Sequence, residues 1–132
     1  MSRKRFTGER IIGHLREADR GLGAGDFMKN LFAEIPDNLK DEWIETILET
    51  PGFRVERIVS RGHRSPAGFW YDQDQDEWVL LLKGSAGLRL EGREDVVVLN
   101  PGDCFHIDRH RGHRVEWTDA TQDTVWLAIH YR

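Results

Sequence analysis

The sequence predicts an all-β domain, built as a small sandwich or barrel, with a short helix and a separate segment in front of it. Short runs of β-branched and aromatic residues recur between residues 53 and 130. Turn-forming pairs such as Pro101-Gly102 separate these runs. The chain has 132 residues, of which 39% are hydrophobic and 32% charged, and this size and composition suit one globular domain.

Residues 1–27 are expected to form an appended N-terminal segment with one short amphipathic helix. Apolar side chains recur at helical spacing from Ile11 to Ala18, and the glycine-rich run 21–25 ends the pattern. This segment carries six basic and four acidic residues, whereas the other 105 residues carry 13 basic and 19 acidic ones. The sequence therefore predicts a boundary between residues 27 and 28.

A second short helix is expected from Asp37 to Thr50, packed against the sheet. Pro36-Asp37 is typical of a helix start, with the Asp37 carboxylate as its cap, and Pro51-Gly52 is typical of a stop. Four apolar residues between them fit a helical stripe. They are Leu39, Trp43, Ile47 and Leu48.

Seven strands are expected after this helix. They cover residues 53–59, 78–82, 87–90, 96–99, 104–107, 114–117 and 125–130. Short strands at regular spacing, joined by tight turns, favour a sandwich or a barrel over an open sheet.

Several classes of protein are excluded by what the sequence lacks. The longest apolar runs, 78–82 and 96–99, are far shorter than the ~20 residues of a membrane-spanning helix. The charged N-terminus leads into no signal-peptide core. Cys104 is the only cysteine, which excludes an internal disulfide and a cysteine zinc cluster. We therefore expect a cytoplasmic protein.

Two separated motifs resemble those of the cupin superfamily of small jelly-roll barrels. Glu77 is followed by six residues and then Gly84, and Gly102 at a turn precedes a short strand and His113. The resemblance covers residues 28–132 and is greatest to small bacterial cupins. It implies a jelly-roll barrel and, as is common in this superfamily, a homodimer.

The resemblance also implies a metal site, although two expected histidines are missing. The positions of the histidine pair hold Trp70 and Asp72 in one register, and Tyr71 and Gln73 in the other. Glu77 and His113 remain, and Asp72 or Gln73 would replace a histidine. Carboxylate and amide oxygens suit Mn²⁺, and imidazole favours Zn²⁺, Fe²⁺ or Ni²⁺. The predicted metal ligands are therefore Asp72, Gln73, Glu77 and His113.

Three further histidines are open candidates. His106 is expected in the cavity wall, either as a metal ligand or as a hydrogen-bonded residue. His110 and His63 are expected either at the barrel mouth or in solvent. Nearby arginines either hold an anionic substrate or form a solvated rim. These are Arg109, Arg111 and Arg114. His14 and His130 receive no role.

The stretch from Arg3 to Asp19 resembles the start of insertion-sequence transposases. No second, recognition helix follows it, and the main body is acidic, so nucleic-acid binding is not expected.

Two functions remain. One is a metal-dependent cupin acting on or binding a small polar metabolite, with isomerase, lyase or dioxygenase chemistry as the enzymatic options. The alternative is a metal-free cupin that binds or senses a small molecule. The sequence assigns no catalytic residue.

Overall fold

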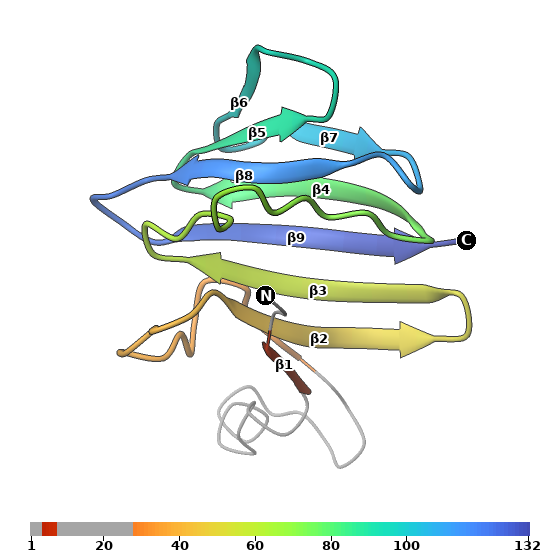
Figure 1. Ribbon diagram of the computed structural model, residues 1–132. Coiled ribbons are helices and arrows are strands. Elements are labelled where there is room, and N and C mark those ends of the chain that lie inside the picture. The colour runs from red at the N-terminus through yellow and green to blue at the C-terminus, as the bar shows by residue number, and fades with distance from the viewer. Residues whose placement is uncertain (1–3, 8–27) are drawn as a thin grey trace.

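The computed structural model describes residues 4–7 and 28–132, which form two β-sheets packed face to face (Figure 1). The larger sheet has the strand order β1-β2-β3-β9-β4-β7, and the smaller has the order β6-β5-β8. The strands are β1 (Lys4–Thr7), β2 (Trp43–Thr50), β3 (Phe53–Ser60), β4 (Asp76–Lys83), β5 (Ala86–Leu90), β6 (Val96–Leu99), β7 (Cys104–Ile107), β8 (His113–Thr118) and β9 (Thr124–Tyr131). The all-β jelly-roll prediction is confirmed.

All seven strands expected after residue 52 are present as β3 to β9, with ends that differ by at most two residues. Residues 28–132 contain no helix. No helix in the described residues is long and apolar enough to cross a membrane.

The helix expected from Asp37 to Thr50 is wrong, because this stretch contains strand β2. Pro51-Gly52 does not end a helix but joins β2 to β3 as a hairpin, in which Thr50 pairs with Phe53. Gly52 has a φ of 80°, as the third residue of a type II turn requires. The helical spacing of the apolar residues was coincidental, because pairing with β3 buries Ile44 and Glu45 instead.

The N-terminal segment is described only in part. Strand β1 pairs in parallel with β2 at the edge of the larger sheet, with Lys4 opposite Trp43. The helix expected between Ile11 and Ala18 and the glycine-rich run lie outside the described residues. The boundary between residues 27 and 28 stays a prediction.

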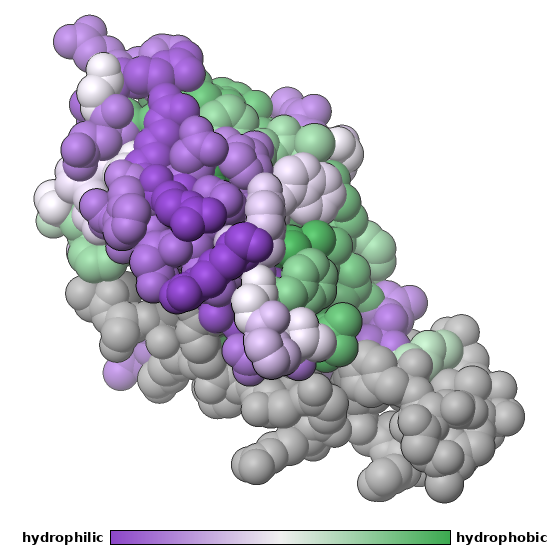
Figure 2. Space-filling model, turned by 90° about the vertical axis from the view of Figure 1, so that its right-hand side faces the viewer, coloured by the Kyte–Doolittle hydropathy of each residue, from purple (hydrophilic) through white to green (hydrophobic). Residues whose placement is uncertain are grey.

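The core lies between the two sheets and is formed by the side chains that each strand directs inward. Ile58, Leu81 and Trp126 of the larger sheet pack against Leu88 and Val115 of the smaller one. Toward one end of the barrel, where β4 and β8 begin and β9 ends, the inward-facing residues become polar. Figure 2 views this end of the molecule and shows hydrophilic residues gathered over one part of it, with a hydrophobic band along one side.

Candidate functional site

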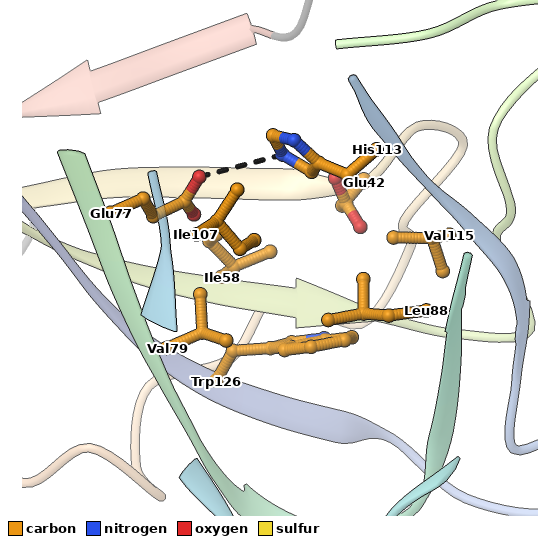
Figure 3. Close-up of a pocket in the computed structure, with 9 residues that line it drawn as sticks. All are labelled: Glu42, Ile58, Glu77, Val79, Leu88, Ile107, His113, Val115 and Trp126. Carbon is orange, nitrogen blue, oxygen red and sulfur yellow. Dashed lines mark ion pairs between the residues drawn. The ribbon is translucent and has the colours of Figure 1, made fainter. Parts of the chain in front are cut away.

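Glu77 and His113 meet inside the polar end of the barrel (Figure 3). Glu77 is the second residue of β4 and His113 the first of β8, so the two facing sheets each supply one. Glu77 Oε1 lies 3.6 Å from His113 Nε2. The two residues are only 4% and 5% exposed. A carboxylate and an imidazole thus face each other out of contact with bulk solvent.

The orientation of the His113 ring is set by its own loop. His113 Nδ1 lies 3.0 Å from the carbonyl oxygen of Arg111. A carbonyl can only accept, so Nδ1 carries a hydrogen, and Nε2 is the ring nitrogen directed at Glu77. Tyr71 supports the ring by stacking on it, with centroids 5.5 Å apart. It also exchanges two backbone hydrogen bonds with His113.

Gln73 and Asp72 point in opposite directions, as neighbours on an extended chain do. The Gln73 amide nitrogen donates to Glu77 Oε1 at 3.3 Å, which brings this predicted ligand into the site. The Asp72 carboxylate instead lies at the exposed rim, 2.8 Å from His110 Nδ1. Of the two registers left open by the sequence, the structure places Tyr71 and Gln73 beside Glu77 and His113.

The cavity beside these residues has mostly apolar walls. The space open to the centre of a water-sized sphere is about 20 Å³, which is room for one water molecule or one ion. Its apolar lining consists of Ile58, Val79, Leu88, Ile107, Val115 and Trp126. Its polar lining consists of Glu77, His113 and Glu42, so that the described residues give the cavity two carboxylates and no permanent cation.

Glu42 was not predicted as a site residue. It lies just before β2 and is oriented by Ser60, whose hydroxyl donates to Glu42 Oε2 at 2.7 Å. The Trp126 indole N–H donates to the same hydroxyl oxygen at 3.2 Å. The sequence could not reveal this role, because Glu42 falls in the stretch predicted as a helix.

His130, to which the sequence assigned no role, lies behind Glu77 and is 1% exposed. Its Nε2 is 3.0 Å from Glu56 Oε1 and 4.0 Å from Glu77 Oε2. Arg54 Nε donates to the other oxygen of Glu56 at 3.0 Å. The period-two alternation of β9, with Trp126 facing inward, was the one signal in the sequence for His130.

The other candidate histidines do not line the cavity. His106 lies on the outer face of β7, opposite Trp78, and its Nε2 is 2.7 Å from the hydroxyl of Tyr131. The expectation that His106 lines the cavity is therefore wrong, because His106 and Ile107 alternate and Ile107 is the inward residue. His63 Nδ1 accepts from the Arg61 backbone N–H at 2.8 Å, away from the cavity. His110 is exposed at the rim.

The sequence pattern of the cupin domain matches residues 58–130, more than half of the chain. The chain belongs to the cupin family. A search of the curated proteins gave no match.

Solved structures similar to this cupin include three of different kinds. A candidate mannose-6-phosphate isomerase from Ralstonia eutropha JMP134 is 48% identical, covering 80% of this chain and 98% of that one, with a TM-score of 0.78. An RmlC-like cupin from Methanocaldococcus jannaschii is 16% identical, covering 74% and 86%, with a TM-score of 0.58. A polyketide cyclase from Streptomyces resistomycificus is 21% identical, covering 70% and 66%, with a TM-score of 0.59. The last two show the fold alone.

Cupins commonly bind metal ions, and the spacing of the inner residues of this cupin fits one. A tetrahedral ion with bonds of about 2.0–2.2 Å separates its ligand atoms by roughly 3.3–3.6 Å. Glu77 Oε1 is 3.6 Å from His113 Nε2 and 3.3 Å from the Gln73 amide. A half-turn of that amide would present its oxygen in place of its nitrogen. Three protein ligands and an open position are typical of a catalytic metal site.

A second group that could hold an ion lies on the outer surface. Ligand atoms of Asp76, His106 and Asp108 all lie within 4.8 Å of one another. Asp76 is already bound by Arg109, through the backbone N–H at 2.9 Å and the guanidinium at 3.2 Å. These hydrogen bonds, the backbone one first, lower the pKa of the Asp76 carboxyl below its ordinary value of 3.8. An ion here would compete with Arg109, so the inner residues fit a metal better.

The three arginines around the site differ in what they bind. Arg109 pairs with Asp76. Arg114 is buried, and its Nε lies 2.9 Å from Glu116 Oε1 while its guanidinium donates to backbone carbonyls of the 65–69 stretch. Arg111 is half-buried and makes no side-chain ion pair within residues 28–132. Arg109 and Arg114 are each paired with an acidic side chain. Of the three arginines, Arg111 is therefore the one whose charge no acidic side chain of residues 28–132 neutralises.

Proposed function

We propose that this cupin binds a divalent metal ion through Gln73, Glu77 and His113, and holds a small polar metabolite at that ion. The observation that carries the proposal is the approach of Glu77 to His113 Nε2 in a buried cavity with room for one ion. Asp72 is not part of the proposed set, because its carboxylate lies at the exposed rim against His110.

The mixed donor set of two oxygens and one imidazole suits Mn²⁺, Zn²⁺, Fe²⁺ or Ni²⁺. A bound ion would polarise a substrate oxygen at its open position. The protein supplies the rest: Arg111 O keeps the His113 ring in place, and the apolar walls exclude water. The Glu42 carboxylate, which lines the cavity without belonging to the ligand set, is placed to accept and return a proton.

We propose a phosphorylated sugar as the class of metabolite. The 48% identical relative is described as a candidate mannose-6-phosphate isomerase. Aldose–ketose interconversion moves one proton between adjacent carbons and one between adjacent oxygens, which needs a base beside the ion, and Glu42 is the carboxylate of the cavity lining that lies outside the ligand set. The two carboxylates of the cavity, Glu42 and Glu77, would repel a phosphate. The hydroxyl-bearing end therefore lies at the mouth of the cavity, next to the ion, and the phosphate stays at the rim, where Arg111 is available.

Metal content and isomerase activity test this proposal. Wild-type protein purified without chelator should carry close to one equivalent of metal, and Glu77→Gln and His113→Ala should carry little. His106→Gln is the matched control, because it replaces a histidine on the outer face and should keep the metal. Conversion of mannose 6-phosphate to fructose 6-phosphate is then measured on the same samples. A well-folded wild type that takes up none of the four ions would refute the metal site.

One observation favours a metal-free binding protein as the second candidate. The two positions at which the family carries histidines hold Tyr71 and Gln73 here, and Gln73 offers its amide nitrogen to Glu77. Thermal unfolding with chelator present separates the two candidates, since a ligand that binds only the folded state raises its stability. Stabilisation by a sugar phosphate or an organic acid under these conditions would support the metal-free function.

We also propose that this cupin forms a homodimer through the outer face of its larger sheet. On that face, four apolar residues are paired with one another across neighbouring strands and form one row. They are Leu48, Val55, Ile129 and Trp78. None is fully buried, and Leu48 is 52% exposed. Apolar rows of this kind mark interaction surfaces. Light scattering should give twice the chain mass for the wild type and one chain mass for Leu48→Asp.

A further inference from the structure

Two buried carboxylates approach the same histidine behind the proposed metal site. Glu56 on β3 and Glu77 on β4 both point into the barrel, and β9 lies between these strands. His130 of β9 stands directly opposite Glu77 in the strand pairing. Glu56 is completely buried and Glu77 is 4% exposed.

The contacts of His130 anchor its ring to β3. Its Nε2 is at hydrogen-bonding distance from Glu56, and Glu56 is itself held by Arg54. The ring thus has an anchored position between neighbouring strands. From there its Nε2 lies 4.0 Å from Glu77 Oε2, while Glu77 Oε1 faces His113 and Gln73.

A carboxylate in an apolar barrel is costly to bury unless donors or cations surround it. Glu77 can turn about its side-chain bonds, and in the orientation seen here one carboxylate oxygen faces His113 while the other faces His130. Electrostatic attraction between Glu77 Oε2 and the N–H of His130 favours that orientation. Removing a group that orients a metal ligand in this way typically weakens metal binding 10- to 100-fold.

We propose that His130 is a positioning residue of the metal site: anchored by Glu56, it holds Glu77 Oε2 so that Oε1 stays turned toward His113. This inference rests on the proposed metal-binding function. It assigns to His130 a role that neither cupin motif contains, because His130 lies 17 positions after His113 in the chain.

The test is metal affinity of the full chain, measured by calorimetry with Zn²⁺, Mn²⁺ and Ni²⁺. His130→Gln keeps an N–H that can reach Glu56, whereas His130→Leu has no donor. Because His130→Leu takes one hydrogen-bond partner away from the buried Glu56 and can fail to fold, the double variant Glu56→Gln/His130→Leu removes that charge as well. His106→Gln is the matched control on the outer face. Circular dichroism and thermal unfolding establish that each variant is folded.

We expect the leucine variants to bind metal at least tenfold more weakly than the wild type, and His130→Gln and His106→Gln to remain within about threefold. The visible spectrum of bound Co²⁺ should also change in the leucine variants alone, since it reports the arrangement of ligands. If His130 had a purely structural role, the leucine substitution would lower stability but leave the metal affinity and the Co²⁺ spectrum of the folded protein unchanged.

Two results would overturn the inference while leaving the metal site standing. One is a folded double variant with wild-type affinity. The other is an equal loss in His130→Gln and the leucine variants, which would show that the N–H donor is not what matters. A wild type that binds no ion would instead refute the metal site, and the role of His130 with it.

Discussion

Glu45 and Arg57 form a completely buried ion pair on the outer face of the larger sheet, with Arg57 Nη2 3.0 Å from Glu45 Oε1. The two residues are direct partners across β2 and β3. Lys29 Nζ reaches the same carboxylate oxygen at 2.8 Å. The Arg57 guanidinium also donates to the carbonyls of Leu31, Ala33 and Glu34, so this pair ties the stretch before β2 to the sheet.

Glu45→Gln should destabilise the protein by about 3–5 kcal/mol, because it leaves two buried cations without their shared anion. Burial is the main cause that lowers the pKa values of Lys29 and Arg57, which indicates that their charges are poorly solvated. Urea unfolding measures the change. Glu49→Gln, the same substitution at an exposed position of β2, should stay within about 0.5 kcal/mol. Similar values for the two variants would contradict the importance of the pair.

Gly84→Ala should cost about 3 kcal/mol, whereas Gly52→Ala should cost about 1 kcal/mol. Both glycines have positive φ, 83° and 80°. A Cβ at Gly84 would also lie 2.8 Å from the Thr124 Cα and 2.9 Å from the Asp123 carbonyl oxygen, while nothing lies within 4 Å at Gly52. Unfolding free energies of the two variants test this difference. Equal costs would mean that backbone conformation alone requires Gly84.

Asp123→Asn should lower stability at neutral pH by about 1 kcal/mol or less, since the pair it breaks is partly exposed. Arg61 binds both oxygens of Asp123, at 2.6 and 3.1 Å, and these hydrogen bonds lower the pKa of the Asp123 carboxyl below 3.8. A lowered carboxyl pKa stabilises the folded state above the unfolded value, and this contribution is lost as pH falls through the folded value. The difference between wild type and variant should therefore be constant above about pH 5 and shrink below 3.8. A difference that persists at pH 2 would contradict this origin.

Deleting residues 1–27 should leave a folded barrel, as the predicted domain boundary requires. The deletion removes β1 from the edge of β2. A loss of about 1 kcal/mol would lower the melting temperature by roughly 4–8 °C for a domain of this size. Circular dichroism and cooperative thermal unfolding of residues 28–132 measure the outcome. A truncated chain without a cooperative transition would show that the boundary is misplaced.

The strands were predictable from local patterns, and the meeting of Glu77 with His113 was predictable from the likeness to the two cupin motifs. Alternating β-branched and aromatic residues indicated β3 to β9, and the spacing around Glu77 and His113 indicated which residues would converge. Region 37–50 failed because its local pattern fits two structures. Its apolar residues have helical spacing, and the hydrophobic signal of a strand is hidden where a charged residue, Glu45, is buried.

The remainder of the site could not be read from the chain. His130, Glu56 and Glu42 are not near the motifs in sequence. Glu42 lines the cavity, and His130 and Glu56 come close to Glu77 because β9 lies between β3 and β4. The choice between Asp72 and Gln73 was equally out of reach. It depends on whether residue 71 or 72 faces the barrel, and this is settled by the backbone pairing of Tyr71 with His113.

By itself, the sequence determined the strands, through their short-range periodicity, and the membership in the cupin family with Glu77 and His113 as the paired residues, through its likeness to the two cupin motifs. The tertiary structure alone decided which side chains face inward around them. Alternation along a strand fixes only relative sides, and the absolute side is set when the two sheets pack. The tertiary structure also buries charged groups that the hydrophobic pattern assigns to the surface: Glu56 on the inner face of the larger sheet, and Arg57 on its outer face, beneath the stretch before β2.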